Sequence, residues 1–302
     1  MADDVSLKLP GVEASGYESE AVFEARLRKR ITRLILFTIA LVLAISFSFP
    51  LYFMVSSSFK AENEILATPV HWIPHDFQGL NQYIRAFESA NVGRWFFNST
   101  LMASLDVIFT VFFSALAGYG FAKFHFKAKR VLFLLVVSTM LVPFQILLVP
   151  LFVEIRSFGW HDTYAGLIIP GLLNAFGVFM MRQFAYNIPD ELLDAARIDG
   201  ASEFRIFWRI VFPLLAPASA SLAIIIFLFS WNNFLWPLII VQNPDLVTLP
   251  VGTTLFTLPY QVQPTWGPAM AVSTLATLPV ALLFLFFQRY FIQGMLVSGI
   301  KG

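Results

Sequence analysis

Five polar or amphipathic side chains lie inside stretches of this 302-residue chain that are otherwise apolar. Asp106 is the only acid well inside such a stretch, where an ionisable group is costly unless it faces water or a partner. Asn174 lies in a second stretch, and Trp231, Asn232 and Asn233 stand together in a third. Amides suit the hydroxyl groups of a sugar, and an aromatic ring suits the apolar side of a sugar ring. We expect these residues to line a path for a polar solute, with one of the two adjacent asparagines facing it.

The same residues permit a second interpretation, in which they hold helices together. Asp106 would then be hydrogen-bonded to a neighbouring helix, or to Asn98, Ser99 or Ser104. Hydrogen bonds between amides on different helices are common in membrane bundles and contribute about 1 kcal/mol each. The sequence leaves both interpretations open.

No arrangement of side chains predicts an enzyme or a metal site. His71 and His75 are four residues apart, but Pro74 lies between them and interrupts the helix that such a pair of ligands needs. The serines have no histidine at a recognisable spacing, and the chain has no cysteine. Gly11 and Gly16 have the spacing of a phosphate-binding loop, but tyrosine and glutamate follow where lysine and a hydroxyl residue belong. We expect a chain that is not an enzyme and binds no metal, ATP or other cofactor itself.

One long polar segment, Pro189–Pro213, interrupts the apolar second half of the chain. Its opening proline and the acids that follow favour the start of a helix. Gly200 is placed to end that helix, and Ser202 to cap a second one, which Pro213 limits. The second helix has an apolar face at positions i, i+3, i+4 and i+7, formed by Phe204, Phe207, Trp208 and Val211. Two short amphipathic helices of this kind need a surface on which to dock, either in this protein, in the lipid interface or on a partner.

The segment resembles the "EAA" loop of ATP-binding-cassette importer permeases. The Glu-Ala-Ala of that family is Asp194-Ala195-Ala196 here, its glycine is Gly200, its isoleucine is Ile210, and its Leu-Pro is Phe212-Pro213, with every spacing kept. Aspartate in the first position keeps the charge on a shorter side chain, and phenylalanine replaces the leucine.

Three further stretches resemble the carbohydrate-uptake branch of that family, at residues 230–234, 248–252 and 288–302, and the likeness extends from about Leu34 to the C-terminus. The resemblance implies a permease that pairs with a second, similar permease and with two ATP-hydrolysing subunits, which bind ATP and Mg. An extracytoplasmic binding protein would deliver a sugar, polyol, glycerol phosphate or glycoside. It also implies that the polar segment couples to the ATPase through Glu191, Asp194, Ala195, Ala196, Asp199, Gly200, Arg205 and Phe207.

The composition independently indicates a membrane protein, since 58% of the residues are hydrophobic, 13% are charged and the mean hydropathy is +0.72. Six apolar stretches are each near the roughly 20 residues that cross a bilayer. Many contain proline, which predicts bent helices around a cavity. The expected fold is therefore an all-α integral membrane protein with six transmembrane helices and a cytosolic helix-turn-helix coupling loop. The expected spans are Leu34–Val55, Ser99–Phe121, Val131–Val153, Ala165–Phe184, Leu214–Val241 and Ala269–Ile292.

The connections between these spans alternate in charge. Sixteen of the 20 Lys and Arg residues fall on one side, together with both termini and the polar segment. The positive-inside rule makes that side cytosolic, and the resemblance implies a bacterial inner membrane. We expect residues 1–33 to form a cytosolic tail and 34–302 the permease domain, with 189–213 as its coupling loop. The long outer connections, 56–98 and 242–268, are then expected to meet the external binding protein or to form interfacial belts.

Two other classes of membrane protein make different demands on the sequence. An enzyme acting on lipid-linked substrates would need clustered His, Asp or Arg at one membrane face, which the sequence does not show. A proton-driven secondary transporter would need several buried acids in different spans, or inverted repeats, and Asp106 is a single acid. The net charge of +1 gives no indication of nucleic-acid binding, and we expect none.

Overall fold

The computed structural model describes the backbone of residues 14–257 and 265–299, and the side chains of residues 25–257 and 265–287. These residues form helices and loops, with a single β-bridge between Lys60 and Phe77. The chain divides into two units, Met1–Ser56 and Ser57–Gly302. The prediction of an all-helical membrane fold is confirmed.

The first unit contains nearly all of α1 (Ala14–Ser57). This helix includes the expected first span and extends back to Ala14, so the second half of the expected tail is helical; residues 1–13 lie outside the described part. No glycine or proline occurs between Tyr17 and Phe49, and the alanine, leucine, glutamate and arginine found there all favour a helix. Nothing therefore stops the helix where the charged residues begin.

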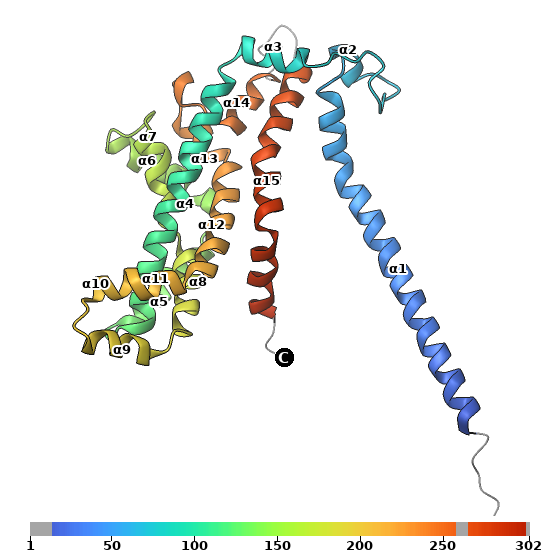
Figure 1. Ribbon diagram of the computed structural model, residues 1–302. Coiled ribbons are helices and arrows are strands. Elements are labelled where there is room, and N and C mark those ends of the chain that lie inside the picture. Colours follow the sequence, from blue (N-terminus) through green and yellow to red (C-terminus); the bar gives the residue numbers. More distant parts are fainter. Residues whose placement is uncertain (1–13, 258–264, 300–302) are drawn as a thin grey trace, which may run out of the picture. The chain divides into compact units, whose positions relative to one another are not determined.

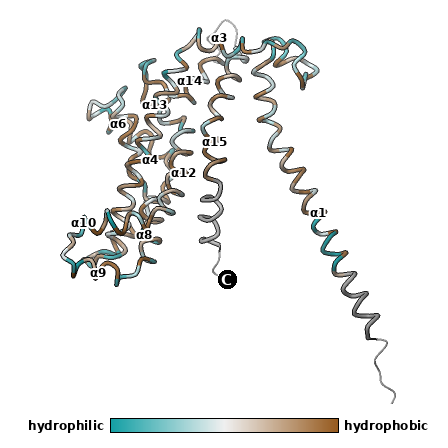
Figure 2. The backbone as a smooth tube through the Cα atoms, viewed as in Figure 1, coloured by the Kyte–Doolittle hydropathy of each residue, from teal (hydrophilic) through white to brown (hydrophobic). Residues whose placement is uncertain are grey.

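The second unit is built around α4 (Val92–Lys123), which packs most extensively against α8 (Ala175–Tyr186) and α12 (Ala216–Trp231) (Figure 1). The contact is close because small residues lie in it: Ala115, Ala185 and Ala218 are fully buried. Figure 2 shows apolar residues along these helices and hydrophilic ones at the connections around α9 (Asp190–Ile198) and α10 (Glu203–Ile206).

Prolines break two of the expected spans, as the sequence indicates. The third becomes α5 (Lys129–Ser138), a 3-10 turn and α6 (Phe144–Ser157), which bend by 103° at Pro143. The fourth becomes α7 (Tyr164–Ile168) and α8, with a 3-10 turn between them that contains Pro170.

The expected fifth span, Leu214–Val241, does not form one continuous helix. The helix α12 ends at Trp231, and a separate short helix, α13 (Leu235–Ile240), follows. A bend of 75° joins α12 to the helical residues Glu203–Leu214 before it. The last span, α15 (Trp266–Gly299), begins three residues before the expected start. Four described helices are long and apolar enough to cross a membrane, and the number is six if each of two bent pairs makes one crossing.

The remaining helices lie in the long connections that the sequence predicts to be external. They are α2 (Glu62–Ile65), α3 (Asn81–Ser89), a 3-10 turn at Pro244–Leu246 and α14 (Leu249–Leu255). The first residues of α4 lie beside this group, and the last residues of α4 lie beside α9 and α10. The second unit therefore has an α3–α14 end and an α9–α10 end.

Candidate functional site

The polar segment folds into two helices joined by a tight turn, which we call the α9–α10 hairpin (residues 189–214). Gly200 has a φ of +77°, in the left-handed region that glycine adopts without strain. Ser202 caps α10, because its Oγ accepts a hydrogen bond from the Arg205 N–H at 3.4 Å. The predicted helix, stop and cap are confirmed.

Two details of the predicted second helix are wrong. Helical structure continues past Pro213 as far as Leu214, and five residues of it, Phe207–Val211, form a π-turn. A π-turn places residues five apart, rather than four, on the same side. Ile206 and Val211 are five residues apart and both fully buried, whereas Phe204 and Trp208 are 62% and 43% exposed.

The inner side of the hairpin packs on the bundle. Leu193, Ile206 and Phe207 are at most 1% exposed and belong to one apolar cluster with Tyr119 of α4 and Met181 of α8. The hairpin is therefore continuous with the core of the second unit.

Ion pairs join the two hairpin helices and tie them to α4. Arg197 donates to Asp194 at 2.8 Å and to Glu203 at 2.7 Å, and the Tyr119 hydroxyl of α4 lies 3.1 Å from the Glu203 carboxylate. Hydrogen bonds to the Glu203 and Asp194 carboxylates raise the pKa of Arg197 above its ordinary value. Lys123, the last residue of α4, donates to Asp190 at 2.8 Å, and this hydrogen bond lowers the pKa of the Asp190 carboxyl.

The outer side of the hairpin exposes large apolar side chains. Ile198, which precedes the turn, is 86% exposed, and Leu192 is 48% exposed. The sequence analysis did not single out either residue, although both are apolar in a segment rich in charges. Of the predicted coupling residues, Phe207 is buried and Ala196 is partly buried. Those at the surface are Glu191, Asp194, Ala195, Asp199, Gly200 and Arg205.

Asp106 lies between helices, as the second interpretation of the sequence supposed. Its side chain is 4% exposed, and its Oδ2 accepts a hydrogen bond from Ser230 of α12 at 2.6 Å. One turn further along α4, Thr110 donates to the Leu172 carbonyl at 3.1 Å, in the break before α8. Asn174 caps α8, because its Oδ1 accepts the Gly177 N–H at 3.1 Å. Ser230 was not among the partners expected for Asp106.

A buried asparagine organises the α3–α14 end. The Asn98 amide donates to the carbonyls of Asp245 and Val247, both at 2.8 Å, and its Oδ1 accepts the Tyr164 hydroxyl at 2.7 Å. Asn98 is fully buried and so connects α4 with α7 and with the segment before α14. Its importance was not foreseen, because its partners lie far away in the sequence.

A cavity of about 480 Å³ opens between the end of α12, α14 and α15, and we call it the α14–α15 pocket. Trp231 and Asn232 line it and Asn233 does not, so one of the two asparagines faces this space. The Trp231 indole donates to the Ala276 carbonyl at 3.0 Å and stacks on Phe227, with ring centres 5.5 Å apart. The Asn232 amide donates to the Leu228 carbonyl at 2.8 Å. Of the five residues predicted to line a solute path, the structure brings only these two together in a cavity.

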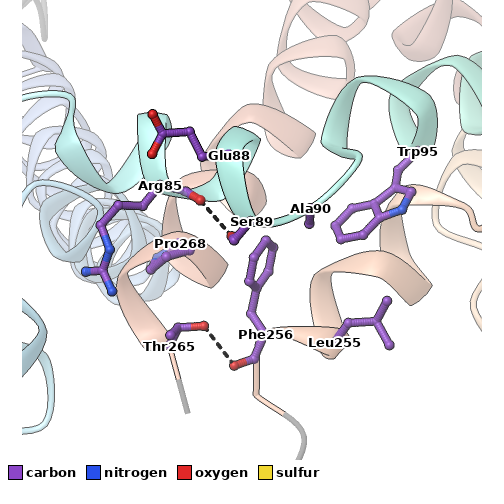
Figure 3. Close-up of a pocket in the computed structure, with 9 residues that line it drawn as sticks. All are labelled: Arg85, Glu88, Ser89, Ala90, Trp95, Leu255, Phe256, Thr265 and Pro268. Atoms are coloured by element: carbon purple, nitrogen blue, oxygen red, sulfur yellow. Dashed lines mark hydrogen bonds between the residues drawn. The ribbon is translucent and has the colours of Figure 1, made fainter. Parts of the chain in front are cut away.

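A second cavity, also about 480 Å³, lies at the α3–α14 end and is here called the Arg85 pocket. Figure 3 shows Phe256 in its middle, with Arg85 and Glu88 reaching outward from α3 and Trp95 on the opposite side. The rings of Trp95 and Phe256 meet edge to face at 5.8 Å. This cavity combines an aromatic floor with one positive and one negative side chain.

The described residues hold no group of three or more His, Asp or Glu side chains that could bind a metal ion. The rings of His71 and His75 are 4.5 Å apart, but a third ligand does not accompany them in the described part of the chain.

A protein-family model matches residues 110–297, which include the hairpin and the residues from α12 to α15. The chain is 36% identical over 274 residues to the arabinooligosaccharides transport system permease protein AraQ of Bacillus subtilis (strain 168), and the alignment covers 90% of this chain and 97% of AraQ. It is 33% identical over 272 residues to the lactose transport system permease protein LacG of Rhizobium radiobacter, with 90% of this chain and 98% of LacG covered. It is 32% identical over 255 residues to the sn-glycerol-3-phosphate transport system permease protein UgpE of Yersinia enterocolitica, with 83% and 91% covered.

The fold is also found in a solved bacterial ABC transporter involved in the import of the acidic polysaccharide alginate. The TM-score is 0.79 at 21% identity, and the match covers 87% of this chain and 98% of that one. The matched family is described as "Binding-protein-dependent transport system inner membrane component". The chain belongs to this family, and it is a permease subunit of an ATP-binding-cassette importer and not an enzyme.

Proposed function

We propose that this permease moves a sugar or a related polar solute across a bacterial inner membrane, with the α9–α10 hairpin and both termini in the cytosol. The orientation follows from the excess of Lys and Arg on that side. The three relatives described above are named for arabino-oligosaccharides, lactose and glycerol phosphate, which supports the solute class. A second permease and two ATPase subunits complete the transporter, and the ATPases bind ATP and Mg.

The observation that carries the proposal is the two-sided construction of the hairpin. Its inner side is part of the core of the second unit, while its outer side exposes Leu192, Ile198 and Phe204. Large apolar side chains at this exposure are typical of a protein interface. An ATPase that seats on the outer side therefore moves the bundle through the inner side.

The hairpin is connected to the α14–α15 pocket through α12. Helical structure runs from Glu203, through the bend at Leu215, to Trp231 at the pocket wall. The Asp106–Ser230 hydrogen bond ties the far end of α12 to α4. A rotation of the hairpin thus turns α12 against α15 and changes the access to the pocket, which we assign to the solute path together with Asn232. Asp106 and Asn174 contribute to this path by holding helices in place, Asp106 through α12 and Asn174 through α8. Asn233 follows directly after Asn232 in the chain.

We assign the α3–α14 end to contact with the external binding protein. The Arg85 pocket has paired charges at its rim and an aromatic floor, which suits a protein surface that presents both kinds of group. A structure of the alginate transporter is described as a complex with a periplasmic protein that carries an alginate pentasaccharide.

Gly200→Val tests the coupling role. A side chain at Gly200 meets no atom within 4 Å, so the substitution acts through the backbone, and a left-handed non-glycine residue costs about 1–2 kcal/mol. We expect the variant to insert and assemble normally but to lose ATP-driven uptake, because the turn opens and the hairpin no longer fits the ATPase. The measurement is solute uptake and ATP hydrolysis by the complete transporter in proteoliposomes.

Gly159→Val is the matched control. Gly159 also has a positive φ, +71°, and open space around its Cβ position, but it lies in the loop between α6 and α7. We expect it to retain uptake. Normal uptake by Gly200→Val, or an equal loss of uptake in Gly200→Val and Gly159→Val, would contradict a coupling role for the hairpin. Uptake in the absence of any ATPase subunit would instead favour a secondary transporter.

A further inference from the structure

We infer that the α14–α15 pocket selects an uncharged polyhydroxylated solute and disfavours phosphorylated or uronic-acid solutes. The inference rests on the proposed function, since it takes the pocket to be part of the solute path. It separates two classes of cargo that occur among the relatives and structural neighbours, in which lactose is neutral whereas glycerol phosphate and alginate are anionic.

The first support is the lining of the pocket. Its volume of about 480 Å³ falls within the range of about 300–1,000 Å³ that small-molecule sites show. None of the described residues that line it is charged. Burial of an ion without a counter-charge is costly, whereas neutral polar groups are satisfied by hydrogen bonds alone. The lining includes two tryptophans and six hydrogen-bonding side chains: Asn232, Thr253, Thr254, Thr257, Ser273 and Thr277.

The second support is the direction of the hydrogen bonds that the threonine side chains of the pocket lining make. The hydroxyls of Thr253, Thr254 and Thr257 all donate to carbonyls of their own segment, at 2.8, 2.7 and 3.2 Å. Thr277 of α15 donates to the Ser273 carbonyl in the same way, at 3.0 Å. A hydroxyl that has given its one proton offers only lone pairs to a ligand. These four threonine hydroxyls accept hydrogen bonds from sugar hydroxyls and repel the oxygens of a phosphate or carboxylate, which have no proton to donate. The side-chain donors that remain in the lining, including those of Asn232 and Ser273, are uncharged.

The third support is the N-terminus of α15, which begins at the pocket wall with Trp266. The N-terminus of a long helix ordinarily attracts anions. Here the Glu62 carboxylate already occupies it, because it accepts the N–H groups of both Trp266 and Gly267, the latter at 3.1 Å. Arg85 lies 3.9 Å from Glu62, and both side chains are part exposed, so the arginine offsets only part of the negative charge. The helix end that would attract an anionic solute is therefore filled by an anion of the protein itself.

The chain has no cysteine, so the labelling rate of a single introduced cysteine reports the electrostatic potential around it. Met270 lines the pocket one turn from Trp266. We expect Met270→Cys, in the complete transporter, to react about tenfold faster with a cationic methanethiosulfonate reagent than with its anionic counterpart. Labelling is measured by mass spectrometry of this chain. Ser89→Cys in the Arg85 pocket, where Arg85 and Glu88 oppose each other, is the control and should show a ratio near one.

Two further measurements complete the test. In the double variant Glu62→Gln/Met270→Cys, the ratio of cationic to anionic labelling rates should come close to the value of the Ser89→Cys control. In Met270→Cys alone, lactose or arabinotriose should slow the labelling, whereas glycerol 3-phosphate should not. Faster labelling by the anionic reagent, protection by glycerol 3-phosphate, or protection by none of these solutes overturns the inference. The proposed function is judged separately, by ATP-driven uptake of the wild-type transporter and its Gly200→Val and Gly159→Val variants, and none of the labelling results bears on it.

Discussion

The contact between α4 and α8 at Gly118 allows a prediction whose size follows from the structure. A Cβ built on Gly118 would lie 2.7 Å from the Met181 Cβ and 2.7 Å from the Arg182 backbone nitrogen. Ordinary contact begins at 3.4 Å, so the two helices must separate by about 0.7 Å to admit one methyl group. The opposing atoms belong to or adjoin the backbone and cannot rotate away. Overpacking of this kind costs about 1–3 kcal/mol.

Gly120, two residues further along α4, provides the matched control, because a Cβ there meets no atom within 4 Å. Replacing glycine with alanine in a helix gains up to about 1 kcal/mol of intrinsic helix propensity, and both variants share that gain. The difference between Gly118→Ala and Gly120→Ala therefore isolates the cost of packing.

We expect Gly118→Ala to be less stable than Gly120→Ala by about 1–3 kcal/mol, measured by reversible unfolding in mixed micelles. We also expect it to weaken the coupling of ATP hydrolysis to uptake, because the displaced α8 leads directly into the hairpin. Equal stability of the two variants would show that α4 and α8 are not packed this closely in the folded protein, and the argument from close helix contact would fail.

Three further substitutions test other parts of the chain. Asn98→Leu should lower stability by about 2–3 kcal/mol in the same unfolding assay, because it removes three hydrogen bonds of a buried amide worth about 1 kcal/mol each. Backbone N–H groups of Asn243 and Gln242 lower the pKa of Asp162, so its stabilising effect is complete above its ordinary pKa near 4 and is lost as the pH falls through the lowered value. Asn tolerates the left-handed backbone of Asp162, which has a φ of +57°, so Asp162→Asn changes the charge without adding backbone strain. The stability difference between wild type and Asp162→Asn should therefore disappear in acid, and a difference that persists at pH 2 would contradict this assignment. Asn232→Leu should reduce uptake while leaving ATPase assembly, measured by co-purification, intact; full uptake would place the solute path elsewhere.

Local chemistry was sufficient to predict the hairpin. The glycine stop at Gly200 and the cap at Ser202 depend on residues within one turn, so a single sequence carries the whole signal. The bend at Pro143 and the 3-10 turn at Pro170 are predictable for the same reason, since a proline removes a backbone donor wherever it stands.

Features that depend on tertiary contact could not be predicted. The π-turn at Phe207–Val211 moves the apolar face by one residue, and no residue in it differs in type from those of an ordinary amphipathic helix. The pairing of Asp106 with Ser230 joins residues that are 124 positions apart. A serine in an apolar helix has many possible partners, so its choice becomes visible only when the helices are placed side by side.

Residues in the stretch from Ser230 to Asn233 contact different parts of the protein. Successive residues of a helix point about 100° apart, so neighbours in the sequence face different surroundings. Ser230 points towards α4 and binds Asp106, Trp231 donates to the Ala276 carbonyl of α15, and Asn232 faces the pocket where α12 ends. The amide and the aromatic ring expected to bind solute both line the pocket, but the ring is 4% exposed and mainly supports the pocket wall. If this pocket is the solute path, as we propose, its accessible polar groups are the Asn232 amide and the hydroxyl groups of α14 and α15. Those hydroxyl groups lie outside the stretch from Ser230 to Asn233.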